Sequence, residues 1–326
     1  MHFKFKLLPV LFSSVSSQVV SNPLPEPYTN FTNYILWYPA VDAVQWHTMY
    51  ARSLQLPDES LLITWENYPH DSLYILPEAS GGYATGSILA AGVSSPSSLE
   101  GGVYIDLYVS EDQAATWKFV SHIGYGAGPE TIQNGNDALW EPWLMLYKGQ
   151  IVCFFSDQRD PAHSQKLVHV TTTDLPKWSD PGPDVVYPAQ GDRPGMTSVA
   201  PIEFTDSYIM TYEYCDRANC AVHYKVAKSP LEFDAADGTS LVSNGRADGS
   251  GLIIVSADNQ EVVFVNEDAA DSAEWKAVDV GMWSAYSGSM RIVTLKGKKK
   301  LLFANGGNMG DPNNTSVACG VVEIPV

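Results

Sequence analysis

The strongest constraint on the fold is a set of short apolar strands that recur along the chain at long intervals. Each follows a turn-forming residue and is rich in Leu, Ile, Val and aromatic side chains. The strands span 61–65, 87–91, 150–155, 208–212, 252–255 and 301–304. Most lie roughly 45–60 residues apart, the interval expected when each repeat forms one propeller blade. No stretch has sustained helical periodicity, so the sequence predicts an all-β, six-bladed β-propeller.

A hairpin-turn motif supports this prediction. Residues 110–117, Ser-Glu-Asp-Gln-Ala-Ala-Thr-Trp, resemble the Asp-box of sialidase-like propellers. Asp112 is expected to bond nearby backbone amides, and Trp117 to pack between strands. Ala114 stands where glycine is usual, so we expect mild strain at a positive φ. Weaker matches to the Asp-box are Thr172-Thr173-Asp174 with Trp178, and Asn266-Glu267-Asp268 with Trp275.

The N-terminus has the pattern of a secretory signal peptide. Lys4 and Lys6 supply positive charge, the apolar run 7–12 follows, and serines within 13–17 offer a cleavage site. The apolar run is too short to span a bilayer, and no later segment is long enough. We therefore expect residues 1–17 to be a signal peptide and residues 18–326 to form a single propeller domain of a secreted, extracellular protein.

The charge of the chain narrows its partners. The 326 residues carry a formal charge of −18. Such a surface repels phosphate groups, so neither nucleic acid nor an anionic membrane is an expected partner. A neutral polysaccharide meets no such repulsion, and sugar C–H faces pack on aromatic rings, although aromatic residues fill sheet faces equally well. Glycosylation sequons at Asn30, Asn313 and Asn314 agree with export, and we expect a monomer.

Four cysteines give little sign of a metal site. Cys215 and Cys220 are close enough in sequence to clip a loop, whereas Cys153 lies in an apolar run that predicts a buried thiol. The fourth is Cys319. The chain has no Cys-x-x-Cys, no His-Glu-x-x-His and no paired-histidine spacing, so no metal or other cofactor is predicted.

Two glutamates are candidates for acid–base chemistry. Glu141 lies between two tryptophans, and partial desolvation would favour the protonated carboxyl that a general acid needs. Glu213 ends an apolar strand between Tyr212 and Tyr214, whose hydroxyls could keep a nucleophilic carboxylate ionised. Local sequence alone favours an ordinary solvent-facing or arginine-paired role for each glutamate.

Six longer motifs change that balance, because they run in order along nearly the whole mature chain. They are Tyr50-Ala51-Arg52-Ser53, Thr64-Trp65-Glu66-Asn67-Tyr68, Trp140-Glu141-Pro142-Trp143, Ser156-Asp157-Gln158-Arg159-Asp160-Pro161, Asp192-Arg193-Pro194-Gly195-Met196 and Met210-Thr211-Tyr212-Glu213-Tyr214. Together they resemble glycoside hydrolase family 93, the exo-α-1,5-L-arabinanases that release arabinobiose. The resemblance implies a six-bladed propeller acting on arabinan, the side chains of pectin.

The same resemblance implies hydrolysis with retention through two glutamates, which fall on Glu141 and Glu213. Retention places two carboxyl groups about 5–5.5 Å apart. We assign Glu141 as acid/base and Glu213 as nucleophile, with the order within the pair left open. The predicted substrate-binding residues are Arg52, Trp65, Trp140, Asp157, Arg193, Tyr212 and Arg291.

Other residues of these motifs receive alternative interpretations. Trp143 is a further candidate to floor a sugar subsite, and for each aromatic candidate a packing role fits as well. Arg159 and Asp160 are expected to form a structural ion pair.

The chain departs from the family pattern in two places. It lacks a strand pair and an Asp-box between Tyr68 and Leu73, and a second contraction follows Asp234, before Leu252. Lost strands would expose sheet edges, so we expect one or two shortened blades. The alternative function is therefore a catalytically impaired, sialidase-like propeller that binds glycan without hydrolysis. A true sialidase is disfavoured, because an opening Phe-Arg-Ile-Pro-like motif is missing and the acidic surface suits an anionic substrate poorly.

Overall fold

The structure is a computed structural model of the whole chain. It describes residues 6–9, 18–19, 30–38, 49–57, 59, 61–66, 71–95, 101–128, 137–215, 220–241, 253–257, 260–267, 275–286, 288–308 and 316–325. Two compact units can be distinguished. Unit 1 comprises 1–69, 254–265 and 276–326, and unit 2 comprises 70–253 and 266–275.

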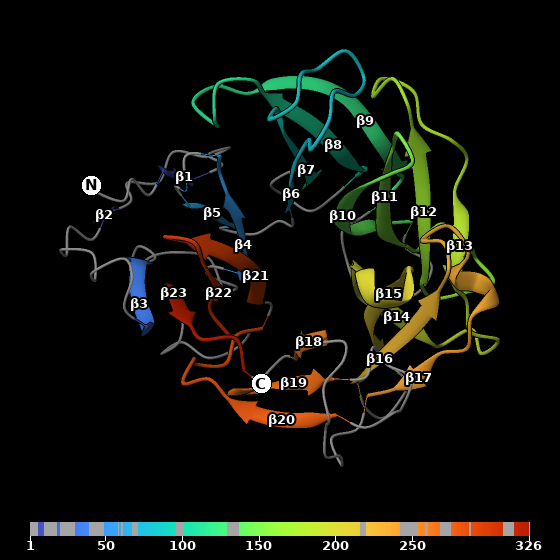
Figure 1. Cartoon of the computed structure of the whole chain (residues 1–326). Coiled ribbons are helices and arrows are strands. Elements are labelled where there is room, and N and C mark those ends of the chain that lie inside the picture. Colours follow the sequence, from blue (N-terminus) through green and yellow to red (C-terminus); the bar gives the residue numbers. More distant parts are fainter. Residues whose placement is uncertain are drawn as a thin grey trace. The chain divides into compact units, whose positions relative to one another are not determined.

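Unit 2 is built from three four-stranded antiparallel sheets, each made of strands consecutive in the sequence (Figure 1). The first contains β6 (Asp71–Ile75), β7 (Ile88–Ser94), β8 (Val103–Ser110) and β9 (Lys118–Gly126). The second contains β10 (Leu139–Tyr147), β11 (Gln150–Asp157), β12 (Lys166–Thr172) and β13 (Gly182–Val185). The third contains β14 (Arg193–Ile202), β15 (Ser207–Cys215), β16 (Cys220–Ala227) and β17 (Thr239–Ser240).

The sheets of unit 2 are held together by apolar layers between them. β10 contacts β6 and β7 of the first sheet and β14 of the third. In β11 every residue after Gln150 is buried, because this strand is covered on both faces. One core cluster includes Leu89, Ile105 and Phe155, and a second includes Phe154 and Met210. Strands buried on both faces therefore read as continuous apolar runs in the sequence.

Unit 1 contains a sheet of order β1-β5-β4, a sheet of order β2-β3-β23-β22-β21 and most of a sheet of order β18-β19-β20. The first uses β1 (Lys6–Pro9), β4 (Met49–Gln55) and β5 (Leu61–Glu66). The second uses β2 (Gln18–Val19), β3 (Phe31–Tyr38), β21 (Gly288–Leu295), β22 (Lys298–Asn305) and β23 (Val317–Val322), and the third uses β18 (Ile253–Ser256), β19 (Val262–Asn266) and β20 (Lys276–Asp279). β3 and β23 pair in antiparallel fashion, so strands from both ends of the sequence share one sheet.

The prediction of an all-β chain of the propeller class is confirmed. The described helices are two single turns of 3-10 helix, Glu203–Thr205 and Phe233–Ala235. None of the described residues forms a helix that is long and apolar enough to cross a membrane. The described strands form six sheets, while the six-bladed count and the single domain stay predictions.

The sheet of β4 and β5 is reduced, as the sequence led us to expect. β5 ends at Glu66, and β6 of the next sheet begins at Asp71. The third strand of this sheet is β1, which pairs with β5 in parallel. β1 falls inside the predicted signal peptide, which stays a prediction. The second expected contraction falls largely on residues 242–252, outside the described residues.

The Asp-box turn has the predicted bonds. Oδ1 of Asp112 accepts hydrogen bonds from the Thr116 amide at 2.8 Å and from the Ser110 hydroxyl at 2.9 Å. Hydrogen bonds, above all from the Thr116 hydroxyl, lower the pKa of Asp112 to about 2. Ala114 has a φ of 66°, so the expected positive φ is present. Thr172, Asp174 and Leu175 form a similar turn. Asp268, in the other weak match to the Asp-box, is outside the described residues.

The cysteine predictions are confirmed. Cys215 and Cys220 form a disulfide between paired residues of β15 and β16. Cys153 is a buried free thiol, and so is Cys319. Burial raises the pKa of both thiols, that of Cys319 to about 12, which makes them unreactive. Of the sequons, Asn30 is exposed, whereas Asn313 and Asn314 lie outside the described residues.

A buried carboxyl in β13, the last strand of the second sheet, makes the stability of the fold depend on pH. Asp184 is fully buried and its Oδ1 lies 2.8 Å from Nδ1 of His169, while its Oδ2 has no hydrogen-bond partner within the described part of the chain. The ammonium of Lys225 donates to the main-chain oxygens of Asp184 and Phe233, at 2.9 Å each. Burial raises the pKa of Asp184 to about 6, against the opposing hydrogen bond from His169.

We predict that Asp184→Asn stabilises the protein at neutral pH and not at pH 4. A raised pKa means that the protonated carboxyl suits the folded state, so its stabilising contribution is present below the unfolded pKa of about 3.9 and is lost as the pH rises through about 6. The free energy of unfolding of the variant relative to wild type should therefore rise by on the order of 2 kcal/mol between pH 4 and pH 7.5. Denaturant titrations at both pH values measure it, with the exposed Asp180→Asn as control. A constant difference would contradict the prediction.

Candidate active site

Glu141 is presented by a distortion of β10. The register of β10 against β11 shifts between Trp140 and Trp143, and Glu141 adopts a φ of 58° within this bulge. A glutamate in the left-handed region is strained and persists only where its surroundings hold it. Here its Oε2 accepts hydrogen bonds from the Ser156 hydroxyl at 2.7 Å and from the Met196 amide at 2.6 Å. The bulge redirects the side chain, and bonds from two other strands fix it.

Met196 itself lies in a second bulge. The register of β14 against β15 shifts between Gly195 and Ser198, and Met196 has a φ of 53°. In unit 1 the same device recurs in β4, where Tyr50 has a φ of 52° inside a register shift. β4, β10 and β14 are each the first strand of a hairpin, with β5, β11 and β15 respectively as the second. The bulge is therefore a repeated feature of these first strands.

Glu213 comes to the site from the regular strand β15. Its Cα partner across the sheet is Gly195 of β14. The disulfide of Cys215 and Cys220 lies beside it, because the carboxylate and both sulfur atoms lie within 4.8 Å of one another. The two cysteines are oxidised, so this cluster offers no pair of thiolates for a metal ion.

The two carboxylates converge on Gly195. A Cβ atom added there would lie 3.1 Å from Oε1 of Glu213 and 3.4 Å from Oε2 of Glu141. The separation of these two oxygens therefore cannot exceed the sum of the two distances. Carboxyl groups about 5–5.5 Å apart occur in retaining glycosidases, whereas inverting enzymes place them at roughly 6.5–9.5 Å. The two carboxylates are therefore close enough to act on one glycosidic bond.

A hydrogen-bond network lies next to this pair. The Arg193 guanidinium donates to Oε1 of Gln165 at 2.9 Å, and Nε2 of Gln165 donates to the Pro194 oxygen at 2.8 Å. Nε2 of Gln165 would also be 2.9 Å from a Cβ at Gly195. Nε of Arg193 is buried without a hydrogen-bond partner among the described residues. Arg193 thus contacts Gln165 next to Gly195, and its role in sugar binding stays a prediction, while Gln165 was missed because it lies outside the recognised motifs.

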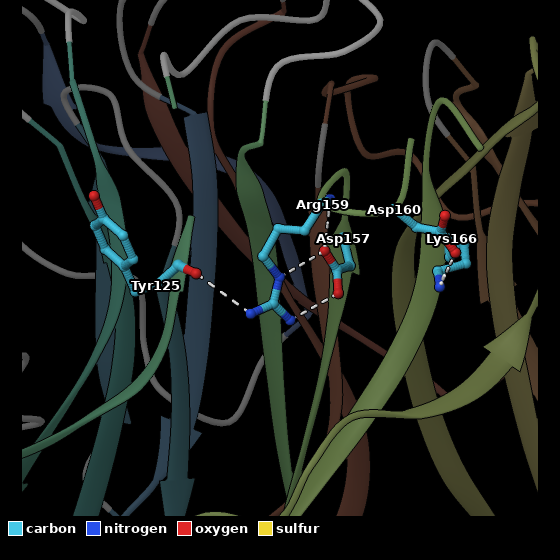
Figure 2. Close-up of polar contacts among 5 residues, drawn as sticks. All are labelled: Tyr125, Asp157, Arg159, Asp160 and Lys166. Carbon is cyan, nitrogen blue, oxygen red and sulfur yellow. Dashed lines mark hydrogen bonds and ion pairs between the residues drawn. The ribbon is translucent and has the colours of Figure 1, made fainter. Parts of the chain in front are cut away.

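Asp157 lies on the same strand as Ser156 but is taken up by an ion pair (Figure 2). Arg159 binds both of its carboxylate oxygens, through Nε at 2.9 Å and Nη2 at 2.8 Å. Asp160 instead pairs with Lys166 at 2.8 Å. The expected ion pair between Arg159 and Asp160 is therefore wrong, because the fork of the guanidinium fits Asp157 on both oxygens.

The aromatic candidates of unit 2 are mostly buried. Trp140 is 6% exposed and Tyr212 is 2% exposed. Tyr212 packs in the core cluster, and its hydroxyl lies 2.9 Å from that of Tyr187. Successive side chains of a strand point to opposite faces, so Tyr212 faces away from the side of Glu213. Trp143 donates from its indole nitrogen to the Val199 oxygen at 3.1 Å. The burial and the contacts of Trp140, Trp143 and Tyr212 are those of residues that pack between strands.

The remaining candidates belong to unit 1. Arg291 donates from Nε to the main-chain oxygen of Ser53, the residue after Arg52, at 2.9 Å. Nε of Arg52 is buried and lacks a hydrogen-bond partner among the described residues. Trp65 is 4% exposed and belongs to the core of this unit. Arg291 thus bonds to the backbone of β4, the strand that carries Arg52, and Trp65 packs inside.

The comparisons with known proteins point in one direction. The chain is similar to the α-L-arabinanase of Penicillium chrysogenum, solved with arabinobiose, at 29% identity and a TM-score of 0.82. It is similar to the GH93 α-L-arabinofuranosidase of Fusarium graminearum, also solved with arabinobiose, at 31% identity and a TM-score of 0.83. Both alignments cover 90% of this chain and 98% of the other. No family model matches the sequence, and no curated protein sequence matches it.

Facing carboxylates on adjacent propeller-class sheets, together with these similarities, define the chain as a glycoside hydrolase. It belongs to glycoside hydrolase family 93.

We predict that Gly195→Ala abolishes activity without unfolding the protein. The new methyl group would lie 2.9 Å from Nε2 of Gln165, 3.1 Å from Oε1 of Glu213 and 3.4 Å from Oε2 of Glu141, so the Gln165 amide must shift and the Glu213 carboxylate must give way by a few tenths of an ångström. Small displacements of catalytic groups cost on the order of 10²-fold in rate. Initial rates on arabinan measure the loss, and melting curves verify the fold. Ser198→Ala, on the same strand beyond the bulge, serves as control. Wild-type activity in Gly195→Ala would show that the carboxylates do not converge as described.

We predict that Asp157→Asn acts mainly on stability. The variant leaves the Arg159 guanidinium without an anionic partner at the largely buried side chain of residue 157. The free energy of unfolding should therefore fall by about 2–3 kcal/mol. Asp160→Asn removes a more exposed pair and should cost less than about 1 kcal/mol. Chemical denaturation compares the two variants. If Asp157→Asn instead keeps full stability and raises KM alone, the predicted role in substrate binding is the correct one.

Proposed function

We propose that the protein is a secreted, exo-acting α-1,5-L-arabinanase that releases arabinobiose with retention of configuration. The observation that carries the proposal is the convergence of Glu141 and Glu213 on Gly195. Arabinan as substrate is supported by the relatives, two of which were solved with arabinobiose. The predicted leader sequence and the exposed sequon at Asn30 support export, and the similarity to the family supports six blades in a monomer that needs no cofactor.

In the first half of the proposed reaction, a carboxylate oxygen of Glu213 attacks the anomeric carbon of the arabinose unit. The glycosidic C–O bond breaks, and its electron pair stays with the leaving oxygen. Glu141 gives its proton to that oxygen, so a neutral sugar hydroxyl leaves. The product of this step is an ester between Glu213 and the sugar.

In the second half, water replaces the leaving sugar. The Glu141 carboxylate takes a proton from this water as the oxygen attacks the anomeric carbon, and the ester bond to Glu213 breaks. Two displacements at one carbon restore the original configuration. Both glutamates return to their starting protonation states.

The contacts of Glu141 define which of its oxygens would handle the proton. Oε2 accepts two hydrogen bonds, so a proton is carried more easily by Oε1. The same two bonds stabilise the ionised carboxylate, which would also suit a nucleophile. The order acid/base Glu141 and nucleophile Glu213 is therefore the part of the proposal that most needs a test.

Arg193 is proposed to bind the sugar beside the glutamates, while sugar binding by Arg52 and by Arg291 stays a prediction from the sequence. Arg193 lies next to the glutamates through Gln165, and its Nε and that of Arg52 have no partner among the described residues. Guanidinium N–H groups suit the hydroxyl and ring oxygens of a neutral sugar, and because both Nε atoms are buried, the contacts would be made by the other guanidinium nitrogens. Asp157, Trp65, Trp140 and Tyr212 would contribute by shaping the site rather than by direct contact.

A second candidate function is glycan binding without hydrolysis. It is favoured by the reduced sheet of β4 and β5, whose third strand is supplied in parallel by β1. A blade lacking its own outer strands could leave the substrate contacts incomplete even with both glutamates in place.

The decisive experiment compares wild type with Glu141→Gln and Glu213→Gln on linear α-1,5-arabinan, with chromatography of the products. We expect arabinobiose as the early product and a loss of at least about 10²-fold in each variant. Azide rescue of alanine variants on an aryl arabinobioside then orders the pair. The nucleophile variant should give a glycosyl azide of inverted configuration, and the acid/base variant one of retained configuration. A folded wild-type protein that releases no sugar would leave only the binding function.

A further inference from the structure

Gln165 is a buried polar side chain that takes no part in the reaction as proposed so far. It lies directly before β12 and is only 4% exposed. Glutamine is mostly exposed in proteins, and a buried amide is costly unless hydrogen bonds satisfy it. The contacts that satisfy this amide all lie within unit 2, which also carries Glu141 and Glu213.

Two of its partners determine which way the amide of Gln165 points. Nη2 of Arg193 donates to Oε1 at 2.9 Å, and a guanidinium can only donate. Nε2 donates to the Pro194 oxygen at 2.8 Å, and a carbonyl oxygen can only accept. Glutamine supplies one acceptor and one donor to these neighbours. A glutamate in its place would lose the donor, and a methionine would lose both groups.

A third partner connects this amide with the strand that carries Glu141. Gln158, directly after β11, is 2% exposed and donates from Nε2 to Oε1 of Gln165 at 3.3 Å. The main-chain amide of Gln158 donates to the Ala138 oxygen at 3.0 Å. Ala138 directly precedes β10. Hydrogen bonds through Gln165 therefore link the start of β10 with the start of β14.

The stretch of β14 that Gln165 holds continues into the bulge at the active site. A Cβ atom at Gly195, the residue after the anchored proline, would lie 2.9 Å from Nε2 of Gln165. Both catalytic carboxylates converge on the same point. The next residue, Met196, donates its amide to Oε2 of Glu141 at 2.6 Å. Because residues 194 to 196 are consecutive, a shift of the proline carbonyl would move Gly195 and this donor together.

The neutrality of the Gln165 amide also matters beside two carboxyl groups. A glutamate of the same shape would add a third carboxylate near Glu141 and Glu213. It would also face the Pro194 oxygen with a second acceptor. Carboxylates that share a site make one another harder to ionise. Arg193 would offset the new charge only on the side of Oε1.

We propose that Gln165 is a positioning residue for the hydrolytic reaction, because its bonds to Pro194 and Arg193 hold the bulge whose amide fixes Glu141. The role in hydrolysis rests on the proposed function, whereas the structural link to Glu141 does not. Gln165 needs no contact with the sugar for this role. Its effect should therefore fall on the chemical step rather than on substrate binding.

Kinetics of Gln165→Met and Gln165→Glu on an aryl arabinobioside test the role in the reaction. Both variants should lower kcat at least about 10-fold and keep KM within about threefold, because displaced carboxylates impair bond cleavage more than binding. Only Gln165→Glu should also move the acidic limb of the pH–rate profile to higher pH. Gln190→Glu adds the same charge at an exposed residue before β14, and this control should behave like wild type.

Two kinetic results would overturn the proposal. One is a kcat within about twofold of wild type in both variants of residue 165, which would leave the amide a packing role. The other is a rise in KM with kcat unchanged, which would mean that Gln165 binds the sugar directly.

A double-mutant cycle in chemical denaturation tests the structural link without any substrate. Gln165→Met should raise the unfolding equilibrium constant by a factor that is at least about 5-fold smaller in a Glu141→Ala background, because the bond from Met196 is already lost there. Gln165→Glu provides the same cycle if the methionine variant does not fold. Additive effects would contradict the proposal even in an active enzyme. A wild type that releases no sugar would refute the proposed function alone.

Discussion

The arrangement of the active site depends on the hydrogen bonds that Glu141 accepts from Ser156 and Met196. These bonds tie β10 to its neighbour β11 and to β14 of the next sheet. Without them a glutamate at a φ of 58° would have little reason to remain in the left-handed region. Met196 can donate because it too lies in a bulge, which turns its amide out of the ladder with β15. The hydrogen bond from the Met196 amide to Glu141 thus holds both strained residues in place. It also directs the Glu141 carboxylate toward Glu213, which lies on a regular strand.

The fold was predictable because β-strands buried on both faces leave continuous apolar runs between turn residues, as in β11. The Asp-box at Asp112 and the clip at Cys215 and Cys220 were predictable for a similar reason, since both are local in sequence. The glutamates were found through motifs. Gln165 could not be found this way, because its role depends on the approach of two sheets. The pairing of Arg159 also failed, because a neighbour two residues away competed with an adjacent one and only geometry decides between them.

The two units differ in how their sheets are completed. Every sheet of unit 2 is a meander of consecutive strands, so its contacts are local in sequence. In unit 1, β3 pairs with β23 and β1 pairs with β5, which joins segments far apart in the chain. Closure of such long loops is entropically costly and slow. Glu141 and Glu213 therefore belong to the part of the chain that can fold first, while Arg291 lies in a sheet that depends on the pairing of β3 with β23.

The disulfide beside Glu213 links the chemistry of the site to the compartment in which the chain folds. Cys215 and Cys220 are strand partners at the very end of the β15–β16 hairpin, two residues beyond the proposed nucleophile. In a reducing cytosol they would remain thiols, and the hairpin end that supports Glu213 would be free to fray. Two thiolates beside a carboxylate would then offer ligands to thiophilic cations such as zinc. A preparation from such a host would be a mixture in which specific activity follows the oxidation state and trace metals act as inhibitors.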